Sequence, residues 1–152
     1  MSTPVRPLKE RFEEKVEKSD GCWEWTASKY PSGYGAIFVE GRCQSAHRIA
    51  YELSIGPIPE GMQIDHMCHN RSCVNPGHLR AVTNKQNTEN RAPTEARGVC
   101  WDSKRKRWLV QVVHNGRHHF GGRFSDLEEA IAVAKAMRLE LFTHNDADRR
   151  AA

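Results

Sequence analysis

A run of cysteine and histidine residues between positions 68 and 78 restricts this chain more than any other feature of its sequence. Cys68, Cys73 and His78 follow one another at intervals of five residues, and thiolate and imidazole together suit a closed, tetrahedral zinc site. The fourth ligand must come from another part of the chain, and Cys22 and Cys43 are both candidates. We therefore expect a structural zinc ion that holds this loop.

A role for the cysteines in the core or in disulfides fits the sequence less well. Free cysteines often act as small buried hydrophobic residues, but three soft ligands at short, even spacing are hard to obtain by accident. A disulfide framework is disfavoured because the chain has five cysteines, an odd number, and no secretory signal precedes them. Zinc binding is the better interpretation.

A second set of residues overlaps this loop and suits a different chemistry. Asp65 and Asn87 offer a carboxylate and an amide oxygen, which are ligands that Mg2+ or Mn2+ accepts. His66 can take a proton from water near neutral pH. On a strand, Asp65 and His66 would point to opposite faces, so a bend or bulge would be needed to bring both into one pocket. Each residue alone would suit an ordinary structural role, but their joint spacing predicts a hydrolytic site.

The whole stretch resembles a known family of nucleases. The pattern Asp-His-x-Cys-x4-Cys-x-Asn-Pro-x-His-Leu, with an asparagine 21 residues after the first histidine, is similar to the HNH (His-Me finger, ββα-metal) endonucleases, above all to the zinc-bearing phage and homing type. The likeness covers roughly residues 21–91. It implies these roles: His66 as general base, Asp65 and Asn87 as ligands of a catalytic Mg2+ or Mn2+, Arg48 near the cleaved phosphate, Cys22, Cys68, Cys73 and His78 as zinc ligands, and Asn75 as a brace of the loop.

The C-terminal third carries the excess positive charge. Residues 1–96 hold equal numbers of basic and acidic side chains, whereas residues 97–152 hold 11 Lys or Arg against 7 Asp or Glu. Such an excess suggests a polyanionic partner. In residues 97–142 the pattern predicts three strands and a helix, with a hairpin turn at Asn115-Gly116 and a helix start at residues 125–128.

This second unit resembles the Apetala-type DNA-binding domain. The likeness rests on Arg97-Gly98-Val99-x-Trp101, Lys106-x-Trp108, Gly122-x-Phe124 and Glu128-Glu129-Ala130, and it implies that the sheet lies in the major groove of DNA. Arginine and glutamine can read guanine or adenine there. The candidates to face DNA are Arg97, Trp101, Lys104, Arg105, Arg107, Gln111, Arg117 and His119.

The expected fold is α+β with two modules. A zinc-stapled ββα-metal (His-Me finger) nuclease module spans residues 21–91, and a small three-stranded antiparallel sheet with one packed helix spans residues 97–142. The remaining segments are an N-terminal helical segment (1–20), a linker (92–96) and a C-terminal tail (143–152). No run of 18 apolar residues occurs, so no membrane span is expected.

The expected function is that of a divalent-metal-dependent endonuclease of homing or phage type, acting on double-stranded DNA in the cytoplasm, as a monomer or a homodimer. One alternative is a non-catalytic, zinc-containing protein that binds specific DNA sequences. Another is an enzyme that acts on RNA. Cleavage assays with each divalent metal, and competition between duplex DNA and structured RNA, would separate the three.

Overall fold

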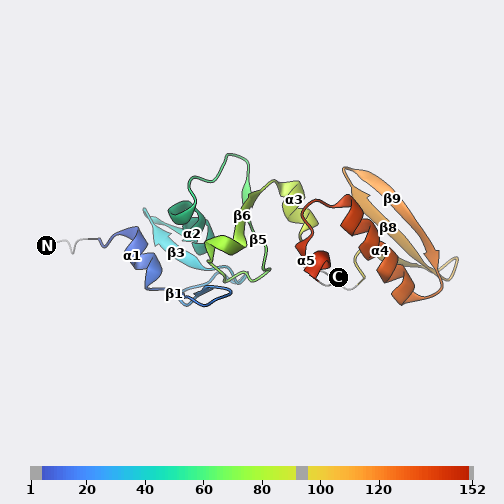
Figure 1. Cartoon of the computed structure of the whole chain (residues 1–152), viewed down its shortest axis with the longest axis horizontal. Coiled ribbons are helices and arrows are strands. Elements are labelled where there is room, and N and C mark those ends of the chain that lie inside the picture. The colour runs from blue at the N-terminus through green and yellow to red at the C-terminus, as the bar shows by residue number, and fades with distance from the viewer. Residues whose placement is uncertain (1–4, 92–95, 151–152) are drawn as a thin grey trace. The chain divides into compact units, whose positions relative to one another are not determined.

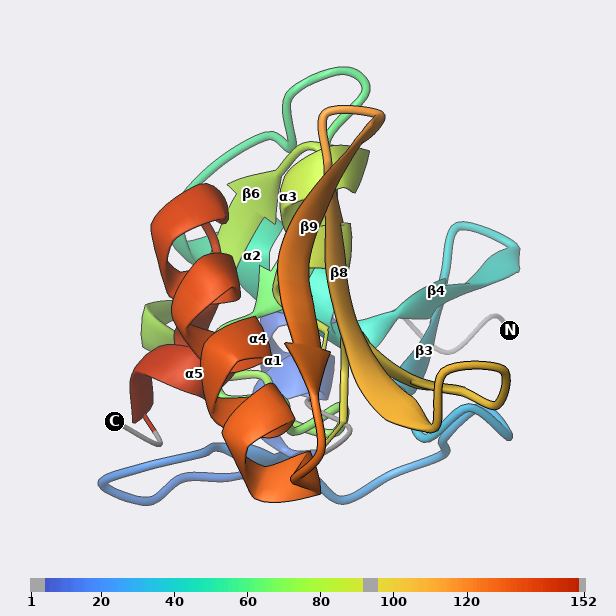
Figure 2. The same cartoon turned by 90° about the vertical axis from the view of Figure 1, so that its right-hand side faces the viewer.

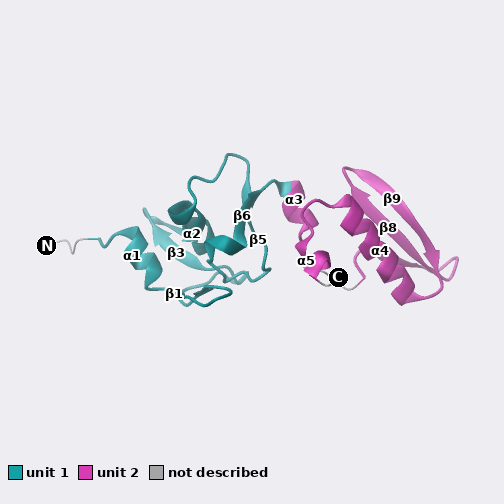
Figure 3. Cartoon of the chain, in the orientation of Figure 1, with its two compact units in different colours: residues 1–84 teal, residues 85–152 magenta. Residues whose placement is uncertain are grey.

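The computed structural model describes residues 5–91 and 96–150, and the chain is a mixed α/β protein (Figure 1). It divides into two compact units, residues 1–84 and residues 85–152 (Figure 3). The expected linker at 92–96 lies, except for Ala96, outside the described residues. The division instead falls at the start of helix α3, because the later residues of that helix pack within unit 2. In the described ranges, no helix combines the length and the apolar character that crossing a membrane requires.

Unit 1 consists of short helices and of strands that pair as two-stranded antiparallel ribbons. Its elements, in chain order, are α1 (Leu8–Glu13), β1 (Val16–Glu17), β2 (Glu24–Trp25), β3 (Ala36–Val39), β4 (Arg42–Ser45), α2 (Ala46–Ser54), β5 (Gln63–His66), the 3-10 helix η1 (Pro76–His78) and β6 (Leu79–Val82). Helix α3 (Asn84–Glu89) follows β6 after a single residue.

Trp25 lies in the core of unit 1 and is only 1% exposed. Phe12 of α1 packs on it, with ring centroids 5.4 Å apart. Gly35 passes so close that a Cβ there would lie 2.6 Å from Trp25 Cδ1 and 2.9 Å from Ala46 Cβ. Only glycine therefore lets the chain before β3 approach both the indole and the start of α2.

The β5–β6 hairpin presents the cysteine loop. The two strands pair antiparallel without a register shift, with His66 opposite Leu79 and Asp65 opposite Arg80. Residues 67–78 connect them and end in η1, whose proline stands at the first helical position. The strand ends thus hold the two ends of the loop that contains most of the metal-binding candidates.

Unit 2 is a three-stranded antiparallel sheet in the order β7-β8-β9, with a long helix packed on it (Figure 2). Two small residues of this helix, Ala130 and Ala134, are fully buried against Val110 of the sheet. A short helix also forms where the sequence predicted a tail. The elements are β7 (Val99–Asp102), β8 (Arg107–His114), β9 (Arg117–Phe124), α4 (Leu127–Leu141) and α5 (Asp146–Arg150).

A β-bulge in β9 changes which side chains share a face. The register shifts between Val110 and Gln111, so that Val110 pairs with Gly122 but Gln111 pairs with Phe120. Gly121 is the extra residue, and a Cβ on it would lie 2.6 Å from Val110 Cγ1. The bulge thereby puts Phe120 and Arg123 on one face, where the Arg123 guanidinium carbon lies 5.1 Å from the centre of the Phe120 ring.

Candidate nuclease site and nucleic-acid interface

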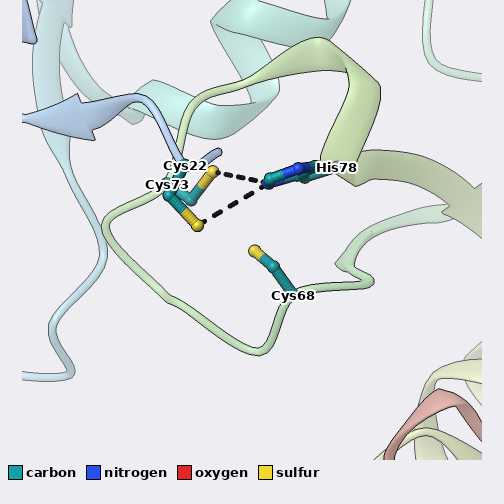
Figure 4. Close-up of side chains that lie close together, drawn as sticks. All are labelled: Cys22, Cys68, Cys73 and His78. Atoms are coloured by element: carbon teal, nitrogen blue, oxygen red, sulfur yellow. Dashed lines mark hydrogen bonds between the residues drawn. The ribbon is translucent and has the colours of Figure 1, made fainter. Parts of the chain in front are cut away.

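Four side chains of unit 1 converge in one cluster, Cys22, Cys68, Cys73 and His78 (Figure 4). Their candidate ligand atoms all lie within 4.8 Å of one another. His78 Nδ1 is 3.6 Å from Cys22 Sγ and 3.5 Å from Cys73 Sγ. Tetrahedral zinc, with bonds of about 2.0–2.3 Å, keeps its ligand atoms about 3.5 Å apart. The donor set and the spacing therefore fit zinc.

Cys22, and not Cys43, completes the cluster. Cys43 lies exposed on β4, whereas Cys22 is brought in by the segment that leads into β2. That segment runs beside the cysteine loop, where Val74 N donates to the Trp23 carbonyl at 2.8 Å. The choice that spacing alone left open is thus decided by strand-like pairing between segments some 50 residues apart.

Asn75 ties this segment to η1. Its Nδ2 donates to the carbonyl oxygen of Gly21 at 2.7 Å, and its Oδ1 accepts from Gly77 N at 2.9 Å. The first bond fixes the neighbour of Cys22, and the second caps the short helix that ends at His78. One amide side chain therefore connects two of the four cluster residues.

Glu24 is a second tie that the sequence did not reveal. Its Oε2 accepts from Ser72 Oγ at 2.8 Å, and its Oε1 accepts from Asn70 Nδ2. No motif in the sequence marks this residue, because its partners lie in the cysteine loop. Only its position, two residues after Cys22, could have hinted at the role.

Two thiols of the cluster shift one another's pKa values in opposite directions. The hydrogen bond between Cys68 and Cys73 lowers the pKa of the Cys68 thiol and, together with burial, raises the pKa of Cys73. Thiolates this close to one another repel, so all of them can ionise together only around a cation. This coupling is a second reason to assign the cluster to a metal.

His66 ends β5 with its ring buried and oriented. Its Nε2 lies 2.9 Å from the carbonyl oxygen of Cys73, and because a carbonyl can only accept, Nε2 must carry the ring proton. Burial lowers the pKa of His66 below its ordinary value, against the opposing effects of the Cys73 hydrogen bond and of the Cys68 and Asp65 charges. The imidazole is therefore neutral near pH 7, with the lone pair on Nδ1.

Two aromatic rings pack around His66. Its centroid lies 4.7 Å from that of His47 and 5.8 Å from that of Tyr34. Burial, followed by the charges of His66 and Arg48, lowers the pKa of His47 to about 3. His47 thus stays neutral beside the predicted base, a neighbour that the sequence analysis did not single out although Arg48 follows it directly. Arg48 itself is exposed on α2.

Asp65 makes a separate set of contacts. Arg80, opposite it on β6, donates to Asp65 Oδ2 from Nε at 3.1 Å and from Nη2 at 2.9 Å. The regular pairing of β5 with β6 means that Asp65 and His66 face opposite sides of the strand. The bend that would bring both side chains into one pocket does not occur in this hairpin. Arg80 therefore orients the buried carboxylate.

Asn87 lies in the middle of α3, which begins two residues after β6 ends. It is half-buried and belongs to unit 2. The position of Asn87 thus depends on the contacts that hold α3 within that unit.

The sheet of unit 2 presents most of the expected DNA-facing residues to solvent. Lys104 and Arg105 are exposed in the turn before β8, and Arg107 and Arg117 are exposed at the starts of β8 and β9. Gln111 is half-buried in β8. We use the name open face for the side of the sheet away from α4, and cross-strand pairing assigns to it Arg107, Leu109, Gln111, Val113, His118, Phe120 and Arg123.

Three of the expected residues lie elsewhere. The Arg97 guanidinium donates to the carbonyls of Thr88 and Glu89, so it is engaged by α3. His119 pairs with a buried valine and therefore points to the helix side. Trp101 is 49% exposed, but it packs against Trp108 at the edge of the sheet, with centroids 4.8 Å apart.

Phe120 and Arg123 are among the open-face residues that the sequence did not point to. Phe120 is 58% exposed, and simple alternation from Phe124 would have turned it toward the helix. The adjacent glycines Gly121 and Gly122 were the available signal, because glycine inside a strand often marks a bulge.

Comparisons with known proteins single out the same region. Residues 44–89 match the family model described as HNH endonuclease. Protein 7.7 of Escherichia phage T7 is 40% identical over 70 residues, which cover 46% of this chain and 54% of that protein. Protein 3.8 of the same phage is 31% identical over 100 residues, 62% of this chain and 82% of that protein.

A larger viral protein is also similar. The Uncharacterized HNH endonuclease L560 of Acanthamoeba polyphaga mimivirus is 30% identical over 121 residues, which cover 79% of this chain and 63% of that protein. This chain thus spans about half the length of Protein 7.7 and less than two thirds of L560. No solved structure gives a significant match.

Proposed function

Because residues 44–89 match the HNH endonuclease family model, we propose that this chain is a metal-dependent endonuclease that hydrolyses phosphodiester bonds in double-stranded DNA. The observation that carries the proposal is the hydrogen bond between His66 Nε2 and the Cys73 carbonyl, at 2.9 Å. It fixes the ring proton on Nε2, so the imidazole, whose pKa burial lowers, presents Nδ1 as its one basic nitrogen, which is what a general base requires at neutral pH.

In the proposed reaction, His66 Nδ1 takes a proton from a water molecule as the water oxygen attacks phosphorus. The bond between phosphorus and the 3′ oxygen breaks, the departing oxygen takes a proton from solvent, and the products carry a 3′ hydroxyl and a 5′ phosphate. Arg48, exposed on α2, would bind the phosphate by charge. The hydrogen bond to Cys73 keeps the ring from turning while the proton moves.

Two further residues would hold a divalent metal. A carboxylate and an amide oxygen are donors that suit Mg2+ or Mn2+, so we assign Asp65 and Asn87 to this role. When bound, such an ion supplies positive charge that stabilises the leaving oxygen. Asp65 and His66 face opposite sides of β5, so this role requires the carboxylate of Asp65, now bonded to Arg80 at 2.9 Å, to turn toward His66.

The Cys3His cluster would bind structural zinc and hold the loop on which this geometry depends. Cys73 supports this link, because its sulfur belongs to the cluster and its carbonyl bonds His66. Zinc bound by all four residues is closed to substrate, as structural sites are. The cluster would therefore act on catalysis through the position of His66.

The open face of unit 2 would bind the DNA backbone and bases. Between residues 97 and 123 the chain has seven Lys or Arg and a single Asp, and such a basic stretch attracts phosphate. Asp102 shares its charge with Arg105 at 3.1 Å and Arg123 at 3.7 Å, so the acidic residue also aligns two of the cations.

A plasmid-nicking assay tests the proposal. We expect the wild type to convert supercoiled DNA in Mg2+ or Mn2+ and to lose activity in EDTA, and we expect His66→Ala to be inactive. His69→Asn is a matched control in the same loop, because His69 has φ +59° and asparagine tolerates that conformation. A fully active His66→Ala protein would contradict the mechanism. Specific DNA binding without cleavage in any divalent metal would instead support a DNA-binding protein.

A further inference from the structure

Helix α3, which carries Asn87, cannot hold its own shape. It has six residues, Asn84–Glu89, and isolated helices shorter than about 12 residues are marginal in water. Its geometry must therefore come from packing. The division between the two units falls after Asn84, so the remainder of the helix is held by contacts inside unit 2.

Glu89 makes the densest of these contacts. It is 4% exposed, and its Oε2 accepts from Thr143 N and Thr143 Oγ1 at 3.0 Å each and from His144 N at 3.3 Å. Its Oε1 lies 3.4 Å from Lys85 Nζ and 3.6 Å from His114 Nε2. The partners come from α3 itself, from β8 and from the segment after α4, so one carboxylate connects three parts of unit 2.

The place of this carboxylate in the helix adds to the argument. Glu89 is the last residue of α3, where a negative charge opposes the helix dipole. Burial would also raise its pKa, yet the hydrogen bonds from Thr143 and His144 and the charge of Lys85 lower it below the ordinary value. A charge that is unfavourable for the helix alone is thus held in place by residues more than 50 positions downstream.

The end of α3 is capped by the same unit. Arg97 donates to the carbonyls of Thr88 at 3.1 Å and Glu89 at 3.0 Å, which belong to the last turn that a helix leaves unpaired. Asn90 Oδ1 accepts from Asp146 N at 2.9 Å. Hydrogen bonds from both side-chain and main-chain groups of unit 2 therefore hold the C-terminal end of α3.

We propose that Glu89 is a positioning residue of the nuclease site, which anchors α3, and with it Asn87, to residues 142–145 of unit 2. The inference rests on the proposed metal-binding role of Asn87. It gives unit 2 a second task besides holding DNA, because the helix that bears a catalytic ligand is fastened to it.

The test compares four full-length variants with the wild type. Glu89→Ala removes every contact of the carboxylate, Glu89→Gln keeps an acceptor oxygen for Thr143, and Thr143→Val removes one donor from the far side. Glu128→Gln is the control, since Glu128 is exposed in the first turn of another helix, α4. The measurements are hydrogen exchange at the amides of residues 85–90, Mn2+ affinity with a DNA duplex present, DNA affinity in EDTA, and plasmid cleavage.

We expect Glu89→Ala to speed exchange in α3 but not in β5 and β6, and to weaken Mn2+ binding about 10- to 100-fold, as loss of an outer support does in metal sites. Thr143→Val should weaken it less, Glu89→Gln should recover most of it, and Glu128→Gln should match the wild type. DNA affinity should stay constant, which a general loss of folding would not allow.

Unchanged exchange in α3, or faster exchange with unchanged Mn2+ affinity, would overturn the inference. A wild type that binds Mn2+ but never cleaves DNA would overturn the proposed function instead. In that case a weaker Mn2+ affinity of Glu89→Ala would still support the anchor.

Discussion

His66 Nε2 and the main-chain oxygen of Cys73 lie 2.9 Å apart, so the predicted base is held by a residue of the metal-binding cluster. The orientation of the imidazole and the shape of the cysteine loop are therefore not independent. A substitution in the cluster should therefore alter catalysis by moving His66, even though the substituted residue does not contact the substrate.

Replacing Cys73 by serine should remove bound zinc and also reduce cleavage. Serine is a poor zinc ligand, and loss of the ion would release the loop whose carbonyl fixes His66. We expect cleavage to fall about 10- to 100-fold or more, with zinc content measured by atomic absorption. Cys43→Ser is the control, because Cys43 lies exposed outside the cluster. If Cys43→Ser lost its zinc and Cys22→Ser kept it, the assignment of the fourth ligand would be wrong.

Substituting alanine for Gly35 should destabilise unit 1. The added Cβ would lie 2.6 Å from Trp25 Cδ1 and 2.9 Å from Ala46 Cβ, and forced overpacking of a core typically costs about 1–3 kcal/mol. Urea unfolding followed by tryptophan fluorescence measures the loss. Gly21→Ala has nothing within 4 Å of the new Cβ and should leave the midpoint unchanged. Equal midpoints for both variants would contradict the packing argument.

The buried ion pair of unit 2 should make stability depend on pH in the acid range. Asp148 is bonded to Arg138 at 2.6 and 2.8 Å. Burial would raise the pKa of Asp148, but the hydrogen bonds from Arg138 and Asn145 and the nearby charges lower it below its ordinary value. A depressed carboxyl pKa adds stability at pH values above the unfolded pKa, near 3.9, and that stability is lost as the pH falls through the folded pKa.

The stability difference between wild type and Asp148→Asn should therefore be largest near pH 7 and shrink below about pH 4. Removing only the partner, as in Arg138→Met, should cost about 3–5 kcal/mol at neutral pH, because it leaves a buried charge unpaired. Denaturant titrations at several pH values give both quantities. Glu128→Gln, exposed in the first turn of α4, is the matched control. A stability difference between wild type and Asp148→Asn that did not change with pH would argue against an ionised Asp148.

Two open-face residues should affect DNA binding in different ways. Arg107→Ala should reduce the slope of log affinity against log salt by about one, because one phosphate contact is lost. Phe120→Ala should weaken binding and leave the slope unchanged, because an exposed ring contributes contact area and no charge. Fluorescence anisotropy at several salt concentrations separates the two. Arg150→Ala, on α5 and away from the sheet, should match the wild type.

Local patterns were sufficient for much of this molecule. Asn115-Gly116 and the alternation around it predicted the β8–β9 hairpin, and the spacing of Cys68, Cys73 and His78 predicted that three ligands would meet. These features depend on neighbours in the chain, which is where a sequence pattern carries its information. The mixed α/β character of the chain followed from the same signals.

The rest depends on contacts between distant segments. The pairing that brings Cys22 to the cluster, the partners of Glu89 and the salt bridge between Asp65 and Arg80 each require the tertiary arrangement. The bulge at Gly121 and Gly122 gives Phe120 the opposite facing from the one that simple alternation from Phe124 would give, because one extra residue shifts every side chain before it to the other face. Arg97 looked like a DNA contact for its charge, yet its guanidinium is engaged by α3 carbonyls.

The separation of Cys22 from the other three cluster residues has a consequence during synthesis. A metal that needs all four can close this site only after His78 has emerged from the ribosome, which happens well after position 78 has been added to the chain. Until then the first strands lack their tie to the cysteine loop, and a loop of some 50 residues remains unclosed. Nascent chains stalled before position 78 should thus remain sensitive to protease whatever the supply of zinc, and those stalled well beyond it should become resistant when zinc is added.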